Sequence, residues 1–284
     1  HAAIAAHRFG LGEADLASIG NDAPGWLLAQ IGPADAARGE GLLGTPEALQ
    51  RVAEEQRMRR EARRAAPSGT EAVDPVTGFY RETLQADARS RLLTAASTAR
   101  PFAERLQLFW ANHFTVSLAK GATRGLVGAF ERDAIRPHIA GRFEDLLWAS
   151  TTHPAMLRYL DNQQSAGPHS RAVAVIEGRA RRADETPRVT GLNENLAREV
   201  LELHTLGVHG GYTQADVTAF AAVLTGWRIP QRGEPGATPF DAAWHEPGRK
   251  TVLGRSYGEG PQALRAVLAE LSRHPSTAQF LATK

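Results

Sequence analysis

The sequence predicts a mainly α-helical protein, a multi-helix bundle of the orthogonal type with one small β-hairpin near residues 227–254. Apolar residues recur at helical spacing in most segments before residue 227 and after residue 260. Proline or a capping residue opens many of these segments, and glycine or proline closes them. Residues 227–254 instead are rich in proline and glycine and contain short strand-like runs.

The composition is that of a soluble globular protein. The chain has 284 residues, of which 42% are apolar and 23% charged, and we expect a single helical domain over residues 1–284. No apolar run approaches the roughly 20 residues of a transmembrane helix. No signal peptide is expected at the start, because no basic leader precedes the apolar first residues. The absence of cysteine excludes disulfides, thiolate zinc sites, iron–sulfur clusters and cysteine nucleophiles.

The charge pattern argues against nucleic-acid binding. The formal net charge is only +2. The arginines between Arg51 and Arg64 alternate with glutamates, and no aromatic residue stands among them to stack on bases. We therefore expect these residues to form a solvated helix face.

The first half of the chain is predicted to be a series of helices. The expected ranges are residues 2–9, 13–19, 26–31, 46–66, 74–98, 102–116 and 121–136. In the range 74–98 we expect four side chains to be buried: Phe79, Leu84, Leu92 and Leu93. In the range 102–116, a helical wheel places His113 within an apolar arc that includes Phe102 and Leu106. A neutral, hydrogen-bonded core histidine is the ordinary explanation of such a position.

Helices at residues 142–150 and 154–160 are predicted to lead into a long loop. Residues 163–190 contain Gly167, Gly178 and a run of charged residues, and we predict a mobile loop for this range. Beyond it, the sequence predicts helices at 213–225, 261–273 and 276–283. Thr213 and Asp216 form a capping box for the first of these three. Residues 244–245 and 250–253 are expected to pair as the hairpin.

The helix predicted at residues 192–206 carries the densest set of polar side chains. A helical wheel separates a core stripe of Leu196, Ala197, Val200 and Leu203 from a polar face of Glu194, Asn195, Arg198 and Glu202. Glu194 and Arg198 have the spacing of a helical ion pair. Glu199 lies near the edge of the polar face, whereas His204 interrupts the apolar stripe.

Two interpretations of these residues stay open. His113 and His204 both point inward, and with Glu199 they could bind a divalent metal such as zinc, iron or manganese. The spacing matches no known metal motif. The alternative is a buried polar network without metal.

Short motifs along almost the whole chain resemble those of one family. They are residues 7–12 (HRFGLG), 109–114 (FWANHF), 193–199 (NENLARE) onward to 211–212 (GY), 216–217 (DV), 224–227 (LTGW), His245 and 250–254 (KTVLG). On these motifs the chain is similar to the bacterial family catalogued as domain of unknown function 1800.

The resemblance implies a mostly helical fold and an exported, periplasmic or secreted protein, but no established reaction. Members often occur beside genes of a second, sulfatase-like uncharacterised family, which implies a functional link. Members also continue beyond the point that matches residue 284, so we expect this chain to lack a C-terminal helical segment. Where the family usually has His-Asp, this chain has His245 and Glu246.

The sequence is therefore consistent with two functions. The first is an exported or envelope enzyme, hydrolase-like or metal-assisted, whose catalytic residues are drawn from the helix at 192–206: Glu194, Arg198, Glu199, Glu202 and His204. The second is a non-catalytic helical module that binds a partner or serves as a scaffold, in which the same residues form a structural network.

Overall fold

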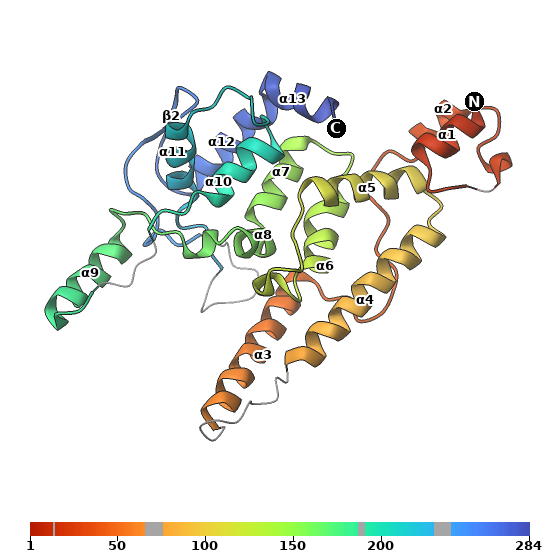
Figure 1. The fold of residues 1–284 in the computed structure, drawn as a ribbon. Coiled ribbons are helices and arrows are strands. Elements are labelled where there is room, and N and C mark those ends of the chain that lie inside the picture. Colours follow the sequence, from red (N-terminus) through yellow and green to blue (C-terminus); the bar gives the residue numbers. More distant parts are fainter. Residues whose placement is uncertain (14, 66–75, 187–190, 230–239) are drawn as a thin grey trace. The chain divides into compact units, whose positions relative to one another are not determined.

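A computed structural model describes residues 1–13, 15–65, 76–186, 191–229 and 240–284 (Figure 1). In the described residues, helices alternate with loops and one two-stranded antiparallel hairpin is present, so the predicted fold class is confirmed. The chain divides into two compact units, His1–Arg142 (unit 1) and Phe143–Lys284 (unit 2). The prediction of a single domain stays a prediction. In the described part of the chain, no helix is long and apolar enough to span a membrane.

Unit 1 consists of helices and short helical turns. They are α1 (Ala2–Phe9), η1 (Leu16–Ser18), α2 (Ala23–Leu28), α3 (Thr45–Ala65), α4 (Val76–Ser97), α5 (Pro101–His113), η2 (Gly121–Thr123), α6 (Val127–Phe130), the π turn η3 (Glu131–Ile135) and η4 (Arg136–His138). The single helix expected at residues 121–136 is thus a chain of short turns. In this unit α3 contacts α4 and α6, and α5 contacts α1 and η3.

The buried side of α4 differs from the predicted one. Phe79 is buried as expected, but Leu84, Leu92 and Leu93 are 46%, 73% and 41% exposed. The residues that α4 buries after Phe79 are small and polar: Thr83, Ser90 and Thr94. The expectation for the three leucines was wrong because hydrophobicity alone does not identify a helix face that packs through hydroxyl groups.

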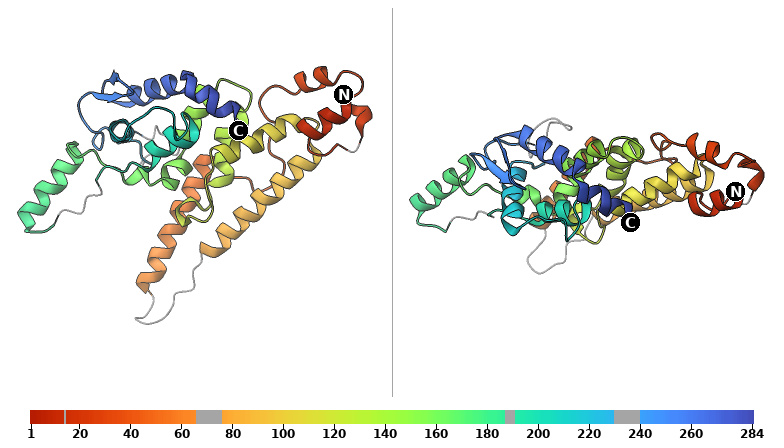
Figure 2. Two further views of the ribbon diagram at one scale, coloured as in Figure 1. Left: turned by 45° about the horizontal axis from the view of Figure 1, so that its top comes forward. Right: turned by 90° about the horizontal axis from the view of Figure 1, so that it is seen from above.

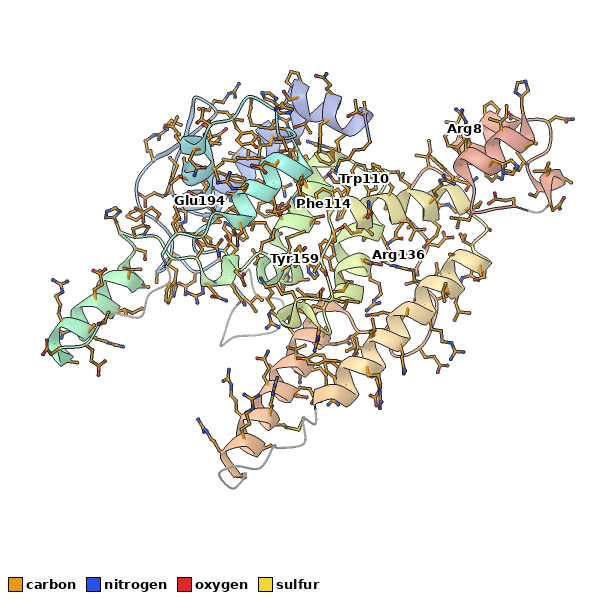
Figure 3. All side chains as sticks on the ribbon, in the orientation of Figure 1. Arg8, Trp110, Phe114, Arg136, Tyr159 and Glu194 are labelled. Carbon is orange, nitrogen blue, oxygen red and sulfur yellow. The ribbon has the colours of Figure 1, made fainter. Side chains whose placement is uncertain are left out.

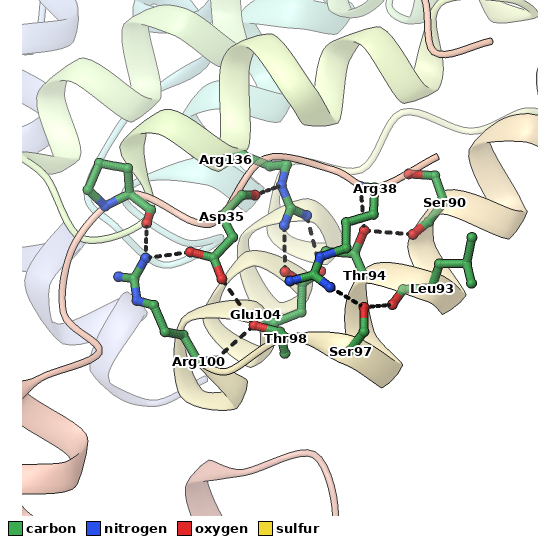
Figure 4. Close-up of polar contacts among 11 residues, drawn as sticks. Asp35, Arg38, Ser90, Leu93, Thr94, Ser97, Thr98, Arg100, Glu104 and Arg136 are labelled. Carbon is green, nitrogen blue, oxygen red and sulfur yellow. Dashed lines mark hydrogen bonds and ion pairs between the residues drawn. The ribbon is translucent and has the colours of Figure 1, made fainter. Parts of the chain in front are cut away.

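One of those hydroxyls helps to attach the segment before α3 to α4 (Figure 4). Thr94 Oγ1 accepts a hydrogen bond of 2.9 Å from the backbone nitrogen of Arg38, and the Arg38 guanidinium donates to Ser97. Nearby, Arg100 forms a 2.9 Å ion pair with Asp35. These long-range contacts satisfy buried polar groups that a purely apolar helix face would leave unpaired.

Unit 2 contains the remaining elements, seen from further sides in Figure 2. They are α7 (Phe143–Thr152), α8 (Pro154–Tyr159), η5 (Asn162–Gln164), α9 (Arg171–Ala183), α10 (Asn195–Glu199), the π turn η6 (Val200–His204), α11 (Gln214–Leu224), β1 (Lys250–Val252), β2 (Arg255–Tyr257), α12 (Pro261–Arg273) and α13 (Pro275–Ala282). Helix α12 packs on α7, and α11 packs on α10 and β1. The predicted core residues of α11 are buried: Val217, Phe220, Ala221 and Leu224.

Residues 171–183, in the middle of the loop predicted at residues 163–190, form helix α9 instead. Helix α9 begins after Ser170, whose hydroxyl accepts a hydrogen bond from the Val173 backbone nitrogen, and Val173 and Ala180 are buried. Figure 1 shows α9 extending away from the rest of unit 2. The loop prediction gave weight to Gly178 and the charged run, but a serine cap and a good arginine and alanine content outweigh one glycine. Residues 187–190 of the predicted loop lie outside the described residues.

The hairpin is present, but its second strand is not the predicted one. Strand β1 pairs antiparallel with β2, and residues 244–245 form no part of the sheet. The turn between the strands uses Leu253 and Gly254, both with positive φ (50° and 73°). Two such residues form the turn type that suits a two-residue hairpin. Leucine is rarely found in this conformation, so the sequence carried no usual turn signal.

Candidate functional site

The candidate site is built on α10, η6 and the start of α11, all in unit 2. The Asn193 side chain accepts a 2.9 Å hydrogen bond from the Asn195 backbone nitrogen, and Ser165 Oγ accepts one of 3.1 Å from the Asn193 nitrogen. These bonds satisfy backbone donors at the helix start. They fix the direction in which the first turn presents its polar side chains, among them Glu194, which is labelled in Figure 3.

Arg198 stands between two carboxylates of its own helix. Its guanidinium nitrogens lie 3.1 Å from Glu194 Oε2 and 3.4 Å from Glu202 Oε1. The predicted Glu194–Arg198 pair is therefore confirmed, with Glu202 one turn further on as a second partner. The Arg198 side chain is 41% exposed, so this ion-pair cluster is in contact with solvent.

The same cluster reaches helix α11. Gln214 Nε2 donates to Glu194 Oε2 at 2.8 Å, and Thr218 Oγ1 donates to Glu194 Oε1 at 2.6 Å. Arg198 also donates to Gln214 Oε1 at 2.8 Å. The hydrogen bonds from Thr218 and Gln214, together with the Arg198 charge, lower the pKa of Glu194. Glu194 is thus held as a carboxylate with both oxygens occupied.

Glu199 has the opposite environment. Burial raises its pKa, and the negative charge of Glu202 raises it further. The effect of the Glu202 charge indicates that the two carboxyl groups lie near each other, Glu199 at the end of α10 and Glu202 in the π turn. Two carboxyl groups of one helix, Glu194 and Glu199, thus have proton affinities displaced in opposite directions. Such divergence is frequent at acid–base sites, although structural ion pairs also produce it.

Tyr212 belongs to this site and was not predicted. Its hydroxyl donates a hydrogen bond to Glu202, and its pKa rises to about 12 through burial, this hydrogen bond and the Glu202 charge. Gly211, with φ +88°, precedes it, and a glycine accepts that conformation without steric cost. In the sequence, Gly210 and Gly211 directly before Tyr212 indicate a tight turn, which brings the Tyr212 hydroxyl back to the helix.

The inward position of His204 is confirmed, since it is 4% exposed, but the wheel failed at Leu203. Leu203 is 44% exposed, whereas Leu201 is fully buried. Residues Val200–His204 form a π turn, in which the hydrogen bonds close one residue later than in an α-helix. The side chains after Val200 are therefore rotated relative to an α-helical wheel.

His113 belongs to unit 1, where it is buried as predicted, 7% exposed. Its ring contacts Phe109, Trp110 and Phe114, with ring centroids 4.7 to 6.3 Å apart. The metal site of His113, His204 and Glu199 draws on both units and stays a prediction. In the part of the chain that the structure describes, no group of three or more histidine, aspartate or glutamate side chains could hold a metal ion.

A second polar cluster surrounds His245, to which the sequence had assigned no role beyond the family motif. His245 Nδ1 lies 2.8 Å from the Thr225 carbonyl oxygen, and His245 Nε2 lies 3.1 Å from the Gly260 backbone nitrogen. A carbonyl only accepts and an amide only donates, so the imidazole is neutral with its proton on Nδ1. Lys250 Nζ lies 3.3 Å from Nε2. Burial is the main cause that lowers the pKa of both His245 and Lys250.

Glu246, in place of the family's usual aspartate, fixes a loop. Its two oxygens contact His169, at 2.6 Å from Nδ1 and 2.9 Å from the backbone nitrogen. A Cβ atom at Gly167 would lie 2.5 Å from the Glu246 backbone nitrogen, so the close approach of the two loops requires glycine there. These contacts give Glu246 a positioning role.

Comparison with known families accounts for the motifs. The model of the family described as protein of unknown function (DUF1800) matches residues 4–284. The chain belongs to this family. The match extends through both units, and the resemblance drawn from the motifs is confirmed. No curated protein and no solved structure matched the chain. The family description assigns no function, so the role of the α10–η6 site is inferred from its own geometry.

Proposed function

We propose that the α10–η6 site makes this protein a hydrolase that works by general acid–base catalysis, with Glu199 as the acid and Glu202 as the base. The observation that carries the proposal is the raised pKa of Glu199 beside the Glu202 carboxylate. A carboxyl group that keeps its proton nearer to neutral pH can give it to a leaving group.

The proton transfers balance as follows. Glu202 accepts a proton from a water molecule, whose oxygen attacks the electrophilic centre of the substrate. Glu199 gives its proton to the leaving oxygen as the bond breaks, and both carboxyl groups then exchange protons with solvent. Arg198, held near Glu202 and partly exposed, stabilises negative charge that develops on the substrate. His204, the last residue of the π turn that carries Glu202, is buried and is given no step in this reaction.

One observation favours the alternative, a non-catalytic helical binding module or scaffold. Both oxygens of Glu194 are occupied by groups of α10 and α11. Such saturation fixes the packing of two helices and leaves Glu194 no capacity for chemistry. In the proposed enzyme, Glu194 is accordingly a positioning residue that orients Arg198.

We extend the proposal to localisation and partner. Membership of the DUF1800 family supports an exported or envelope protein, functionally linked to a sulfatase-like family. An envelope hydrolase and an envelope scaffold share this location, so the location does not discriminate between the two functions.

A pair of leaving groups tests the acid role. We expect Glu199→Gln to lower kcat/KM about 10²- to 10⁴-fold for a substrate that releases an alkyl alcohol, since that product needs a proton from the acid. The loss should be much smaller for the matched p-nitrophenyl substrate, whose leaving group departs as a stable anion. Acetate, phosphate, sulfate and glycoside substrates should each be assayed as such a pair.

The control is Glu177→Gln, an exposed glutamate of α9 in the same unit, which should leave the rates unchanged. Equal losses for both leaving groups, or no wild-type hydrolysis above the rate in buffer for any substrate, would contradict the acid–base proposal and support the scaffold.

A further inference from the structure

Unit 1 has two adjoining cavities along α4, far in sequence from the candidate site. Their volumes are about 400 Å³ and about 420 Å³, and four lining residues are common to both: Leu84, Asp87, Leu118 and Val127. We call the joined cavities the α4 groove. Each cavity is in the size range of small-molecule pockets.

The floor of the groove is apolar and unusually accessible. Leu84, Leu92 and Leu118 line it and are 46%, 73% and 40% exposed. Large apolar side chains grouped in a concavity mark a binding surface more often than scattered ones do. A ligand that covers these leucines gains the free energy of removing their surface from water.

The acidic groups of the groove are already neutralised within unit 1. Asp87 forms a 2.7 Å ion pair with Arg132, and Glu131 pairs with Arg91. These pairs lie along the first cavity, which holds the larger share of the leucines. Arg136, the remaining charged residue among those described for this cavity, is paired with Glu104. That end therefore offers an apolar surface whose charged groups are paired.

The second cavity carries an excess of positive charge. Arg59, Arg81 and Arg124 line it, and Asp87 is the only carboxylate among its described lining residues. Because Asp87 is paired with Arg132, the guanidinium groups of Arg81 and Arg124 can attract an anion. Arginine also binds carboxylate and phosphate oxygens with good geometry.

We propose that the α4 groove binds a single-chain anionic amphiphile. The anionic head lies at Arg81 and Arg124, and the alkyl chain follows Leu84 and Leu118 toward Leu92. A carboxylate and a phosphate head are both consistent with the charge. This site is independent of the hydrolase proposal, since it lies wholly in unit 1.

Calorimetric titration of the full chain with amphiphiles below their critical micelle concentrations tests the proposal. Decyl phosphate and decanoate should bind. Decanol and decyltrimethylammonium should bind at least tenfold more weakly, because a tenfold change in affinity corresponds to the loss of about one hydrogen bond to a charged group. Arg81→Gln and Arg124→Gln should each weaken decyl phosphate binding about tenfold by the same reasoning. Leu84→Ser should weaken the binding of decyl phosphate and leave the binding of inorganic phosphate unchanged.

Arg89→Gln is the matched control, an exposed arginine of α4 that does not line the groove. It should bind decyl phosphate like the wild type. Equal binding of the anionic and cationic amphiphiles, an equal loss in Arg89→Gln, or binding to anionic vesicles but not to monomeric decyl phosphate would each overturn the proposal. Unchanged melting temperatures in the variants exclude a folding defect as the cause of weaker binding.

Discussion

Each unit contains an arginine paired with glutamate, and the two clusters differ in burial and in how the arginine shares its donors. In unit 1, Arg136 donates to both oxygens of Glu104, at 3.0 and 2.5 Å, and its Nε donates to the Asp35 carbonyl at 2.8 Å (Figure 4). The two side chains are 9% and 1% exposed. In unit 2, Arg198 divides its donors among Glu194, Glu202 and Gln214 and is 41% exposed.

The comparison shows what a dense polar sequence does and does not indicate. A buried bidentate pair uses its donors on one partner and excludes water, so it serves packing. A shared, half-exposed arginine keeps contact with solvent and can exchange partners when a ligand enters. The same residue types thus serve structure in unit 1 and, in our proposal, chemistry in unit 2.

The largest expected effect is on the buried pair. Arg136→Met leaves Glu104 buried without a counter-charge, and we expect the free energy of unfolding to fall by about 3–5 kcal/mol. Urea unfolding of the full chain measures this loss. Adding Glu104→Gln should recover part of it, because the second substitution removes the unpaired charge. A loss below about 1 kcal/mol in the single variant would make the two clusters energetically alike and break the comparison.

The matching substitution in unit 2 should have a smaller effect. Arg198→Met removes two partly exposed ion pairs, and we expect a loss of about 1 kcal/mol or less. The same urea titration measures it. High salt should reduce the difference between Arg198→Met and the wild type, since exposed pairs are screened. A salt-independent loss as large as that of Arg136→Met would show that the cluster is as closed as the buried one.

The smallest effects concern pH and have opposite signs on one helix. The folded-state pKa of Glu194 is lowered, so its stabilising contribution is complete above the ordinary value of 4.5 and is lost as the pH falls through the lowered pKa. The folded-state pKa of Glu199 is raised from the ordinary value of 4.5, so stability falls as the pH rises above 4.5, and the loss is complete once the pH exceeds the raised value.

At pH 7 we therefore expect Glu194→Gln to lower the melting temperature and Glu199→Gln to raise it, each by no more than about 2–4 °C. At pH 4 both differences should shrink, because the wild-type side chains are then more fully protonated. Shifts of the same sign for both variants at pH 7 would contradict the divergent environments of Glu194 and Glu199. A lower melting temperature for Glu199→Gln would also contradict the raised pKa on which the acid–base proposal rests.

Local signals in the sequence predicted local structure well. The capping box of Thr213 and Asp216 is present, because its partners lie within one turn of helix. The inward positions of His113 and His204 followed from their apolar neighbours. The ion pair of Glu194 and Arg198 followed from helical spacing alone.

The errors have three physical causes. The π turn at Val200–His204 changes the helical period, so Leu203 faces solvent, whereas the α-helical wheel places it in the core. The hairpin turn uses Leu253 at positive φ, which residue preference argues against. The buried face of α4 packs through hydroxyls that pair with a distant segment. Tyr212 and the His245 cluster likewise depend on contacts between segments that only the folded chain brings together.

Asp216 closes a long loop with one side chain. Its Oδ2 accepts from Thr213 at the start of α11, while its Oδ1 accepts a 2.7 Å hydrogen bond from the Leu253 backbone nitrogen, 37 positions later. The helix cap is a local contact that forms early, whereas the hairpin contact must wait for the loop to close. The Asp216 carboxylate of the capped helix accepts a hydrogen bond from the turn at Leu253, a residue that rarely adopts positive φ. The two oxygens of one carboxylate thus connect a helix cap to a hairpin turn 37 positions later in the chain.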